Sequence, residues 1–336
     1  MSRRRARPAR SPLGPPARRR RPIQLIATLA LLVAPIAVAI ALYVAFASDG
    51  ASGGAPRLPL AVHTPQLPSG SDSQTERKPA PGIDLAGVDA FHLALRKPPR
   101  AGLVFDLDSG EVLWRREPLK VLSIASLTKI MTALLVVERT RPSEPVRITQ
   151  AALDYTGSGI GLLPKGRRVR LEALLNGLLL VSGNDAAIAL AVHVSGDERR
   201  FVALMNRRAR EWGLRCTHFA SSHGLEPGNR SCARDLAVLT RLAMAKPRIR
   251  RIARRRQAQL HFPIKGGKLY LYGHNPLIRL GYAGAIGLKT GYTDAAGRCF
   301  VGVVRRGARR LGVVLLDSRD PAKHAPKLLD AAFAEP

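Results

Sequence analysis

The sequence predicts an α/β domain of the α+β type, in which an antiparallel sheet is flanked by helices and carries an all-helical insert. Alternating apolar runs typical of strands begin near residue 102 and return after residue 286, whereas the intervening residues have helical periodicity. Strands at both ends of one segment must meet to pair, so the helices between them should pack on the sheet. Hydrophobic residues make up 46% of the chain, which is ample for such a core.

The elements can be placed in order along the chain. Two apolar runs around Asp108-Ser109-Gly110 predict a β-hairpin over residues 102–115. A helix is predicted from about Ala125 to Glu138, and we expect it to be buried because apolar residues occupy nearly every side of it. The remaining predicted elements are helices at 171–179, 185–194, 198–212 and 231–244 (with Ser231 as N-cap), strands near 286 and at 298–305 and 311–316, and a last helix at 325–333.

The N-terminal region predicts export. Residues 1–22 contain nine Arg and no acidic residue, and residues 23–47 form a stretch of 25 residues without a charge. That length spans a bilayer as one helix, and the Arg cluster predicts a basic cytoplasmic tail, a transmembrane signal-anchor and an extracytoplasmic remainder. The alternative is a signal peptide cleaved near Ala47, after the small-x-small sequence Ala45-Phe46-Ala47. We favour the anchor because a cleaved apolar region usually has about 7–15 residues.

Composition divides the rest of the chain in two. Residues 48–83 are rich in Gly, Ser and Pro and predict a flexible linker, and residues 84–336 form the predicted catalytic domain. The net charge of +30 is compatible with many polyanions, but the dense run Arg248–Arg256 has no interleaved aromatic residues and no nucleic-acid motif beside it. We therefore expect a solvated helical face there and no nucleic-acid partner.

Three short motifs indicate the chemistry. They are Ser126-Leu-Thr-Lys129, Ser182-Gly-Asn184 and Lys289-Thr290-Gly291, and their first residues lie 56 and 107 positions apart. Each motif alone is common by chance. In this order and spacing they are the signature of serine acyl-enzymes that handle penicillin-like substrates.

The first motif supplies a nucleophile and a base. Ser126 and Lys129 lie three residues apart at the start of a helix, so their side chains share one face. A serine hydroxyl needs a base within hydrogen-bond reach, and Lys129 can act as the base only when it is neutral. Burial and a nearby cation would lower its pKa, and Lys289 is the candidate cation.

The other two motifs supply a proton shuttle and a binding site for the substrate carboxylate. Ser182 would relay a proton to the leaving amine, and Asn184 would bind the substrate amide and help to hold Lys129. Lys289 and Thr290 would bind the terminal carboxylate of the substrate. Gly291 would let the substrate backbone approach the strand closely.

The residues around these motifs resemble the low-molecular-mass penicillin-binding proteins, a family of serine D-alanyl-D-alanine carboxypeptidases and related endopeptidases. The resemblance covers roughly residues 96–333 and rests on segments 124–133, 181–187, 201–206, 217–219, 223–225, 233–237 and 287–297. It implies the penicillin-recognising fold that DD-peptidases share with β-lactamases. It also implies an oxyanion hole formed by the backbone N–H groups of Ser126 and Tyr292, and a further basic residue for the carboxylate, for which both Arg319 and Lys323 are candidates. Many relatives add a C-terminal β-domain, which we do not expect here.

The predicted function is that of a serine-type D-Ala-D-Ala carboxypeptidase. It would trim peptidoglycan stem peptides that end in D-Ala-D-Ala and would be inhibited by β-lactams. The nearest alternative is a DD-endopeptidase that cleaves cross-links with the same residues. A β-lactamase is a weaker alternative: the segment Leu225–Asn229 suggests it, but that segment is one residue short of the lactamase spacing. An inactive wall-binding protein is also a weaker alternative, because all the catalytic residues are present.

The cysteines and histidines predict no metal centre. Cys216 and Cys232 flank a polar, Gly-containing stretch that a disulfide could hold in an exported protein, and Cys299 reads as a buried core residue. The histidines are dispersed without a metal-binding spacing, and His223 belongs to a turn signal. We expect neither a metal nor a cofactor.

Overall fold

The computed structural model describes residues 81–335. The predicted tail, transmembrane segment and almost all of the predicted linker lie outside the described residues. Within 81–335, no helix is long and apolar enough to cross a bilayer. Ile83 was assigned to the linker, but it is buried, and Asp84 next to it pairs with Glu111. The folded domain therefore includes the last residues of the predicted linker.

A five-stranded antiparallel sheet forms the centre of the described domain, as predicted. Its strand order is β2-β1-β11-β10-β9. The strands are β1 (Ala101–Asp106), β2 (Val112–Arg116), β9 (Ala285–Thr293), β10 (Gly297–Arg306) and β11 (Arg309–Leu316). The pairing of β1 with β11 joins the two ends of the domain, with Val104 opposite Val313. Three further pairs of short strands lie outside this sheet: β3 (Leu122–Ser123) with β6 (Arg230–Ser231), β4 (Pro145–Arg147) with β5 (Arg168–Arg170), and β7 (Gln257–His261) with β8 (Lys268–Tyr272).

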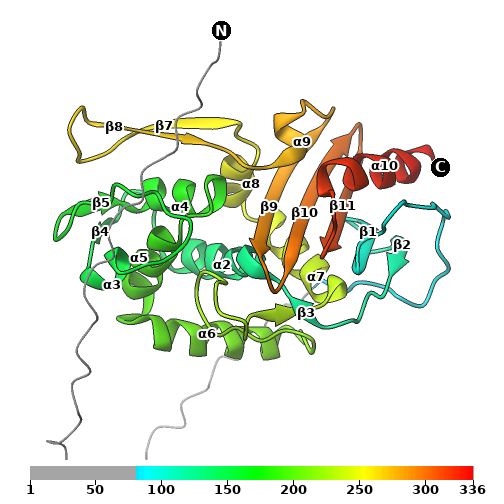
Figure 1. The fold of residues 1–336 in the computed structure, drawn as a ribbon, viewed down its shortest axis with the longest axis horizontal. Helices are drawn as coiled ribbons and strands as arrows, with labels where there is room; N and C mark the ends of the chain where they lie inside the picture. The colour runs from blue at the N-terminus through cyan, green and yellow to red at the C-terminus, as the bar shows by residue number, and fades with distance from the viewer. Residues whose placement is uncertain (1–80, 336) are drawn as a thin grey trace, which may run out of the picture. The chain divides into compact units, whose positions relative to one another are not determined.

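Helices cover both faces of the sheet (Figure 1). The helical elements are η1 (Ala125–Thr128), α2 (Lys129–Arg139), α3 (Gln150–Leu153), α4 (Leu171–Leu180), α5 (Asn184–Ser195), α6 (Glu198–Glu211), α7 (Ala233–Ala245), α8 (Pro247–Ala253), α9 (Pro276–Arg279) and α10 (Pro321–Ala334). On one face, Leu328 and Leu329 of α10 pack with Val313 and Leu315. Leu277 of α9 belongs to the same cluster. Helices α2, α7 and α8 pack on the opposite face, which carries alternate residues such as Val314.

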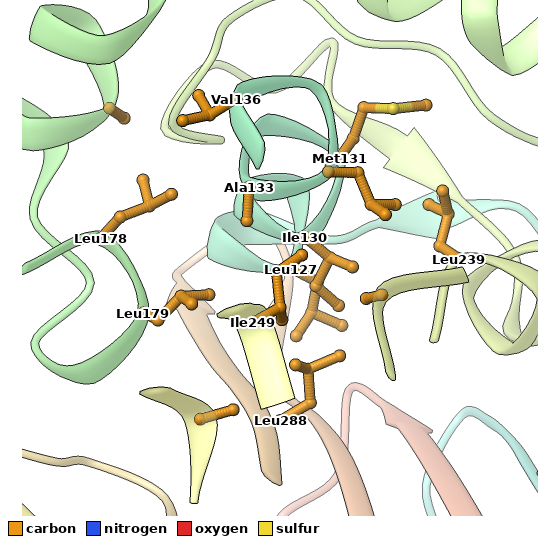
Figure 2. Packing of buried hydrophobic residues seen from close by; sticks show 14 of the residues in the cluster. Leu127, Ile130, Met131, Ala133, Val136, Leu178, Leu179, Leu239, Ile249 and Leu288 are labelled. Atoms are coloured by element: carbon orange, nitrogen blue, oxygen red, sulfur yellow. The ribbon is translucent and has the colours of Figure 1, made fainter. Parts of the chain in front are cut away.

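Helix α2 is buried, as its apolar sequence predicts. Side chains from four other elements surround it: Leu178 and Leu179 of α4, Leu239 of α7, Ile249 of α8 and Leu288 of β9 (Figure 2). Burying a side chain of this size stabilises the fold by about 1.5–3 kcal/mol. This packing fixes the N-terminal end of α2 beside β9, which brings the first and third motifs together.

Several predicted boundaries were wrong. Ser231 is not a helix cap: it ends β6, its hydroxyl lies 2.8 Å from that of Thr217, and Cys232 takes the N-cap position of α7. The last helix begins at Pro321 rather than 325, because the Asp320 side chain accepts a hydrogen bond from the N–H of Lys323. The run Arg248–Arg256 is only partly a solvated face, since Ile249 and Ile252 are buried and Arg256 directly precedes the β7–β8 hairpin, which was not predicted.

Candidate active site

The chain turns sharply just before Ser126. Ala125 has a φ of +47°, in the left-handed region, and the 3-10 turn η1 then leads into α2. Two glycines pack against this turn. A Cβ atom on Gly224 would lie 2.0 Å from the carbonyl oxygen of Ala125, and one on Gly291 would lie 3.0 Å from the amide nitrogen of Ser126. Gly224 therefore has no room for a side chain, and Gly291 has little.

Lys129 is fully buried directly behind Ser126. Its Nζ lies 3.0 Å from Ser126 Oγ, 2.7 Å from Asn184 Oδ1 and 2.7 Å from the carbonyl oxygen of His223. Burial lowers the pKa of Lys129 well below its usual value, and the charge of Lys289 lowers that pKa further. The predicted effect of Lys289 on Lys129 is therefore present, but it comes second to burial.

The hydrogen bonds also set the direction in which the neutral amine faces. A neutral lysine amine has two N–H groups and one lone pair. The carbonyl of His223 can only accept, and so can Asn184 Oδ1, because the Nδ2 group of Asn184 donates to the Thr156 carbonyl at 2.6 Å. When Lys129 is neutral, these two acceptors take both of its N–H groups, and the lone pair faces Ser126 Oγ. Lys129 can take the hydroxyl proton without rearrangement.

Ser182 and Lys289 form a second buried pair. Lys289 Nζ donates to Ser182 Oγ at 2.9 Å and to the Thr290 carbonyl at 2.7 Å. Burial lowers the pKa of Lys289 to about 7, so its charge is easily changed near neutral pH. Within residues 81–335, Ser182 makes no hydrogen bond to Lys129, and its hydroxyl is held by Lys289 instead.

An open cleft of about 560 Å³ lies in front of these residues. Ser126, Ser182, Thr290, Gly291 and Tyr292 line it, so residues from all three motifs meet at one surface. Lys129 and Lys289 lie beneath this surface, 0% and 2% exposed. The arrangement places the Ser126 hydroxyl in the cleft and the Lys129 amine out of solvent, which is the geometry that acyl transfer by a serine requires.

Comparison with known proteins decides the family. A family model described as D-alanyl-D-alanine carboxypeptidase matches residues 98–320. The chain belongs to this family. The D-alanyl-D-alanine carboxypeptidase DacB2 of Mycobacterium tuberculosis is 39% identical over 222 residues, which are 65% of this chain and 75% of the relative. DacF of Bacillus subtilis is 33% identical over 245 residues, which are 70% of this chain but only 62% of that longer protein.

Solved structures show the same fold in other members of the carboxypeptidase family and in related enzymes. The D-alanyl-D-alanine carboxypeptidase from Mycobacterium tuberculosis superposes with a TM-score of 0.68 at 35% identity, covering 72% of this chain and 94% of that one. A mutant of the Streptomyces K15 DD-transpeptidase gives a TM-score of 0.67 at 30% identity, covering 72% and 100%. The described residues therefore have the penicillin-binding DD-peptidase fold, with mixed helices and an antiparallel sheet.

The structure distinguishes Arg319 from Lys323, the two candidates for binding the substrate carboxylate in this carboxypeptidase. Arg319 lines the cleft, whereas Lys323 does not; its side chain is 79% exposed and pairs with Asp320 at 3.3 Å. Asn184 does not line the cleft either, and its observed contacts hold Lys129 rather than face the substrate. The ring of Tyr292 is exposed, and its hydroxyl donates to Asp294 at 2.8 Å, which leaves its backbone for the predicted oxyanion hole.

Sequence reasoning missed three residues of this family member's site. His223, interpreted as part of a turn, contributes the carbonyl that holds Lys129, and its imidazole lies between Glu198 and Glu226 at 3.7 and 3.5 Å. His274 and Arg298 both line the cleft. His223 lies in a segment that carries the family resemblance and could have been found there. His274 and Arg298 belong to no motif, and only the fold brings them to the cleft.

The cysteines of this family member pair as the sequence suggests. The structure joins Cys216 and Cys232 in a disulfide with Cα atoms 5.5 Å apart. Cys299 is buried and free, and burial raises the pKa of its thiol to about 12. That thiol donates to the Ala296 carbonyl at 3.5 Å, and the raised pKa keeps it in the less reactive thiol form.

Proposed function

We propose that this protein is a serine-type D-alanyl-D-alanine carboxypeptidase that removes the terminal D-Ala from peptidoglycan stem peptides. One observation carries the proposal: a buried Lys129 Nζ lies 3.0 Å from Ser126 Oγ and 2.7 Å from each of two acceptors, Asn184 Oδ1 and the His223 carbonyl, so a neutral Lys129 would direct its lone pair at the serine. A serine activated in this way attacks a carbonyl carbon to form an ester. Membership of the carboxypeptidase family supports D-Ala-D-Ala as the bond attacked.

In the acylation step, Ser126 Oγ attacks the carbonyl carbon of the penultimate D-Ala and passes its proton to Lys129 Nζ. The carbonyl oxygen becomes an oxyanion, which the backbone N–H groups of Ser126 and Tyr292 would stabilise. The carbon–nitrogen bond then breaks. The leaving amine takes one proton from the Ser182 hydroxyl, which lines the cleft and accepts a hydrogen bond from Lys289. Ser182 would then take back the proton that Lys129 received from Ser126, so that Lys129 is neutral again before deacylation.

In the deacylation step, a water molecule attacks the ester on Ser126. The bond between the carbonyl carbon and Ser126 Oγ breaks, the shortened peptide leaves with a new carboxylate, and Ser126 recovers a proton. Lys129 is again the base for the water, since it remains buried beside the same oxygen. The net reaction consumes one water and releases one D-Ala.

The terminal carboxylate of the substrate would bind at Lys289, Thr290 and Arg319. Thr290 and Arg319 line the cleft, and Lys289 lies directly beneath it. A bound carboxylate favours the charged form of Lys289 and so raises its pKa above about 7. β-Lactams carry a carboxylate and a reactive amide in a similar arrangement, so we expect them to acylate Ser126.

A matched pair of serine variants tests the proposal. Ser126→Ala should abolish both covalent labelling by a fluorescent penicillin and release of D-Ala from a peptide ending in D-Ala-D-Ala. Ser143→Ala, at an exposed loop position, should keep both. Labelling of the Ser126→Ala protein would refute the assignment of the nucleophile. A label that the wild-type protein loses within seconds would favour a β-lactamase, and no label at all would favour an inactive wall-binding protein.

The structure offers the β-lactamase alternative little support. Such an enzyme needs an additional carboxylate to activate the deacylating water. Glu226, the carboxylate of the segment Leu225–Asn229, does not line the cleft, and its side chain lies 3.5 Å from the His223 ring.

We further propose that residues 23–47 anchor the protein in the membrane with the catalytic domain outside the cytoplasm. The charge-free stretch of 25 residues after nine arginines supports this orientation. The protein should remain with the membrane fraction after a high-salt wash, and external protease should reach the catalytic domain. Recovery of a soluble form that begins just after Ala47 would instead establish a cleaved signal peptide.

A further inference from the structure

A second cavity, of about 350 Å³, adjoins the catalytic cleft at His274. His274 lines both the cleft and this cavity, so the two are neighbours. The other side chains of the second cavity come from the start of the β7–β8 hairpin and from α9: Arg256, Gln257, Tyr272 and Arg279. No acidic residue of the described domain lines it. The cavity therefore presents two guanidinium groups, an amide and a phenol.

The two guanidinium groups have no partner in the described domain. Neighbouring arginines of α8 do: Arg248 and Arg251 both pair with Glu172, at 3.1 and 3.2 Å. Arg256 and Arg279, by contrast, make no side-chain hydrogen bond or ion pair within residues 81–335, and both are exposed. Two unpaired cations that face one cavity repel each other, and a bound anion would relieve that repulsion. A carboxylate is the anion that a planar guanidinium fork fits best in a peptide.

The position of the second cavity indicates which part of a bound substrate would lie in it. In the proposed reaction the terminal carboxylate belongs to the leaving residue, and it binds at Lys289 and Thr290. His274 lies at this end of the site: it lines a small pocket together with Thr290, and the charge of Lys289 acts on its ring. Tyr292 of the predicted oxyanion hole lies three residues beyond Lys289 along β9. The second cavity thus lies on the leaving-group side of the bond that is cut.

We propose that Arg256 and Arg279 form a subsite for a second carboxylate carried by the leaving group. This inference rests on the proposed function and extends it to leaving groups larger than D-Ala. A cross-linked peptide has such a leaving group, because the amine released from D-Ala is then part of a longer, acidic peptide. The subsite would adapt the same catalytic residues to cleavage of cross-links.

Three model substrates test the subsite. All share one acyl-D-alanyl part, and their leaving residues are D-alanine, D-α-aminoadipate and the side-chain carboxamide of D-α-aminoadipate. The last two differ only in the charge of the side chain. We expect the wild-type protein to cleave the acid about tenfold more efficiently than the carboxamide, as judged by kcat/KM. The double variant Arg256→Gln/Arg279→Gln should reduce this ratio to about one.

The control is a second double variant that removes the same charge elsewhere. Arg147 and Arg168 are exposed partners on β4 and β5, and neither lines the cleft or the second cavity, so Arg147→Gln/Arg168→Gln should keep the tenfold ratio. A thermal unfolding transition shows that each double variant is folded. Equal rates on acid and carboxamide in a wild-type protein that cleaves the D-alanine substrate would overturn the subsite alone. An unchanged tenfold ratio of kcat/KM for acid over carboxamide in Arg256→Gln/Arg279→Gln would also overturn the subsite. Failure to cleave any of the three substrates would overturn the proposed function, and the subsite with it.

Discussion

Asn184 Oδ1 accepts a hydrogen bond from Lys129 Nζ at 2.7 Å, and this contact fixes the position of a lysine whose pKa is lowered chiefly by burial. The amide cannot turn over, because its Nδ2 group donates to the Thr156 carbonyl at 2.6 Å. Asn184 is 4% exposed and carries no charge, so it holds Lys129 without the strong attraction to the lysinium form that a carboxylate would add. Ser182-Gly-Asn184 therefore supports the Ser126–Lys129 pair from the opposite side of the site.

Replacement of Asn184 by aspartate should inactivate the base at neutral pH. Asn184→Asp keeps the shape but puts a negative charge next to Lys129 Nζ, which favours the protonated lysine and raises its pKa. A lysine with a depressed pKa is neutral, and active, at pH 7; a raised pKa makes it protonated there and neutral only at higher pH. We expect acylation by a fluorescent penicillin to fall about 100-fold at pH 7 and to recover as the pH rises. An unchanged pH profile would contradict the assigned role.

Lys289→Gln should weaken recognition of the substrate carboxylate. A charge-assisted hydrogen bond contributes about 1.5–3 kcal/mol, so kcat/KM for a peptide with a free D-Ala carboxylate should fall roughly 10- to 150-fold. The C-terminal amide of the same peptide is the control and should lose far less. If Lys289 acts only by lowering the pKa of Lys129, both peptides will lose equally and the acid limb of the pH–rate profile will move to higher pH.

Arg319 and Lys323 should differ although only four positions separate them. Arg319→Gln removes a cation from the wall of the cleft, and we expect KM for a carboxylate-terminated peptide to rise about three- to tenfold. Lys323→Gln removes the same charge from an exposed side chain outside the cleft and should leave KM unchanged. Steady-state kinetics on the two variants decides between them, and the reverse order of effects would show that Lys323 binds the carboxylate.

Gly224→Ala should disturb the nucleophile through the backbone. The new Cβ would lie 2.0 Å from the carbonyl oxygen of Ala125, so the turn that carries Ser126 must move. A displacement of this kind can cost about 100-fold in rate, and penicillin labelling should slow accordingly. Gly213→Ala is the matched control, since Gly213 also has a positive φ (66°) but open space around it. It should lose about 1 kcal/mol of stability and label normally; equal labelling rates for both variants would exclude the steric explanation.

Loss of the disulfide should destabilise the domain without changing its chemistry. Cys216 and Cys232 are 16 positions apart, and closing a loop of this size stabilises a protein by about 3 kcal/mol in the chain-entropy model. In a domain of this size we expect Cys216→Ser/Cys232→Ser to lower Tm by about 6–12 °C. Calorimetry of exported protein measures the shift, and penicillin labelling at 25 °C should persist. A Tm within a degree of the wild-type value would show that the bond adds no stability.

Much of the fold and site could be predicted because the relevant signals are local. The alternation of residues 102–115 and the apolar sequence of α2 reflect which faces must be buried, and both predictions were confirmed. The β7–β8 hairpin was missed because its exposed and buried residues alternate over only five positions in each strand, next to a dense arginine run. The predicted N-cap at Ser231 is one residue too early, since Cys232 is the N-cap of α7. Ser231 instead pairs with Leu122 of β3, a contact between distant segments that local sequence does not reveal.

The available chemical groups can be named from the chain alone: a serine and a lysine one helical turn apart, two further polar motifs in a fixed order, and two cysteines able to pair. These follow from residue type and short spacing. What those groups can do depends on contacts between residues that are far apart in the chain. Lys129 meets Asn184 and His223 across 55 and 94 positions, and Lys289 meets Ser182 across 107. Packing of α2 against β9 creates these contacts and removes water from both lysines, and that burial makes a lysine a base.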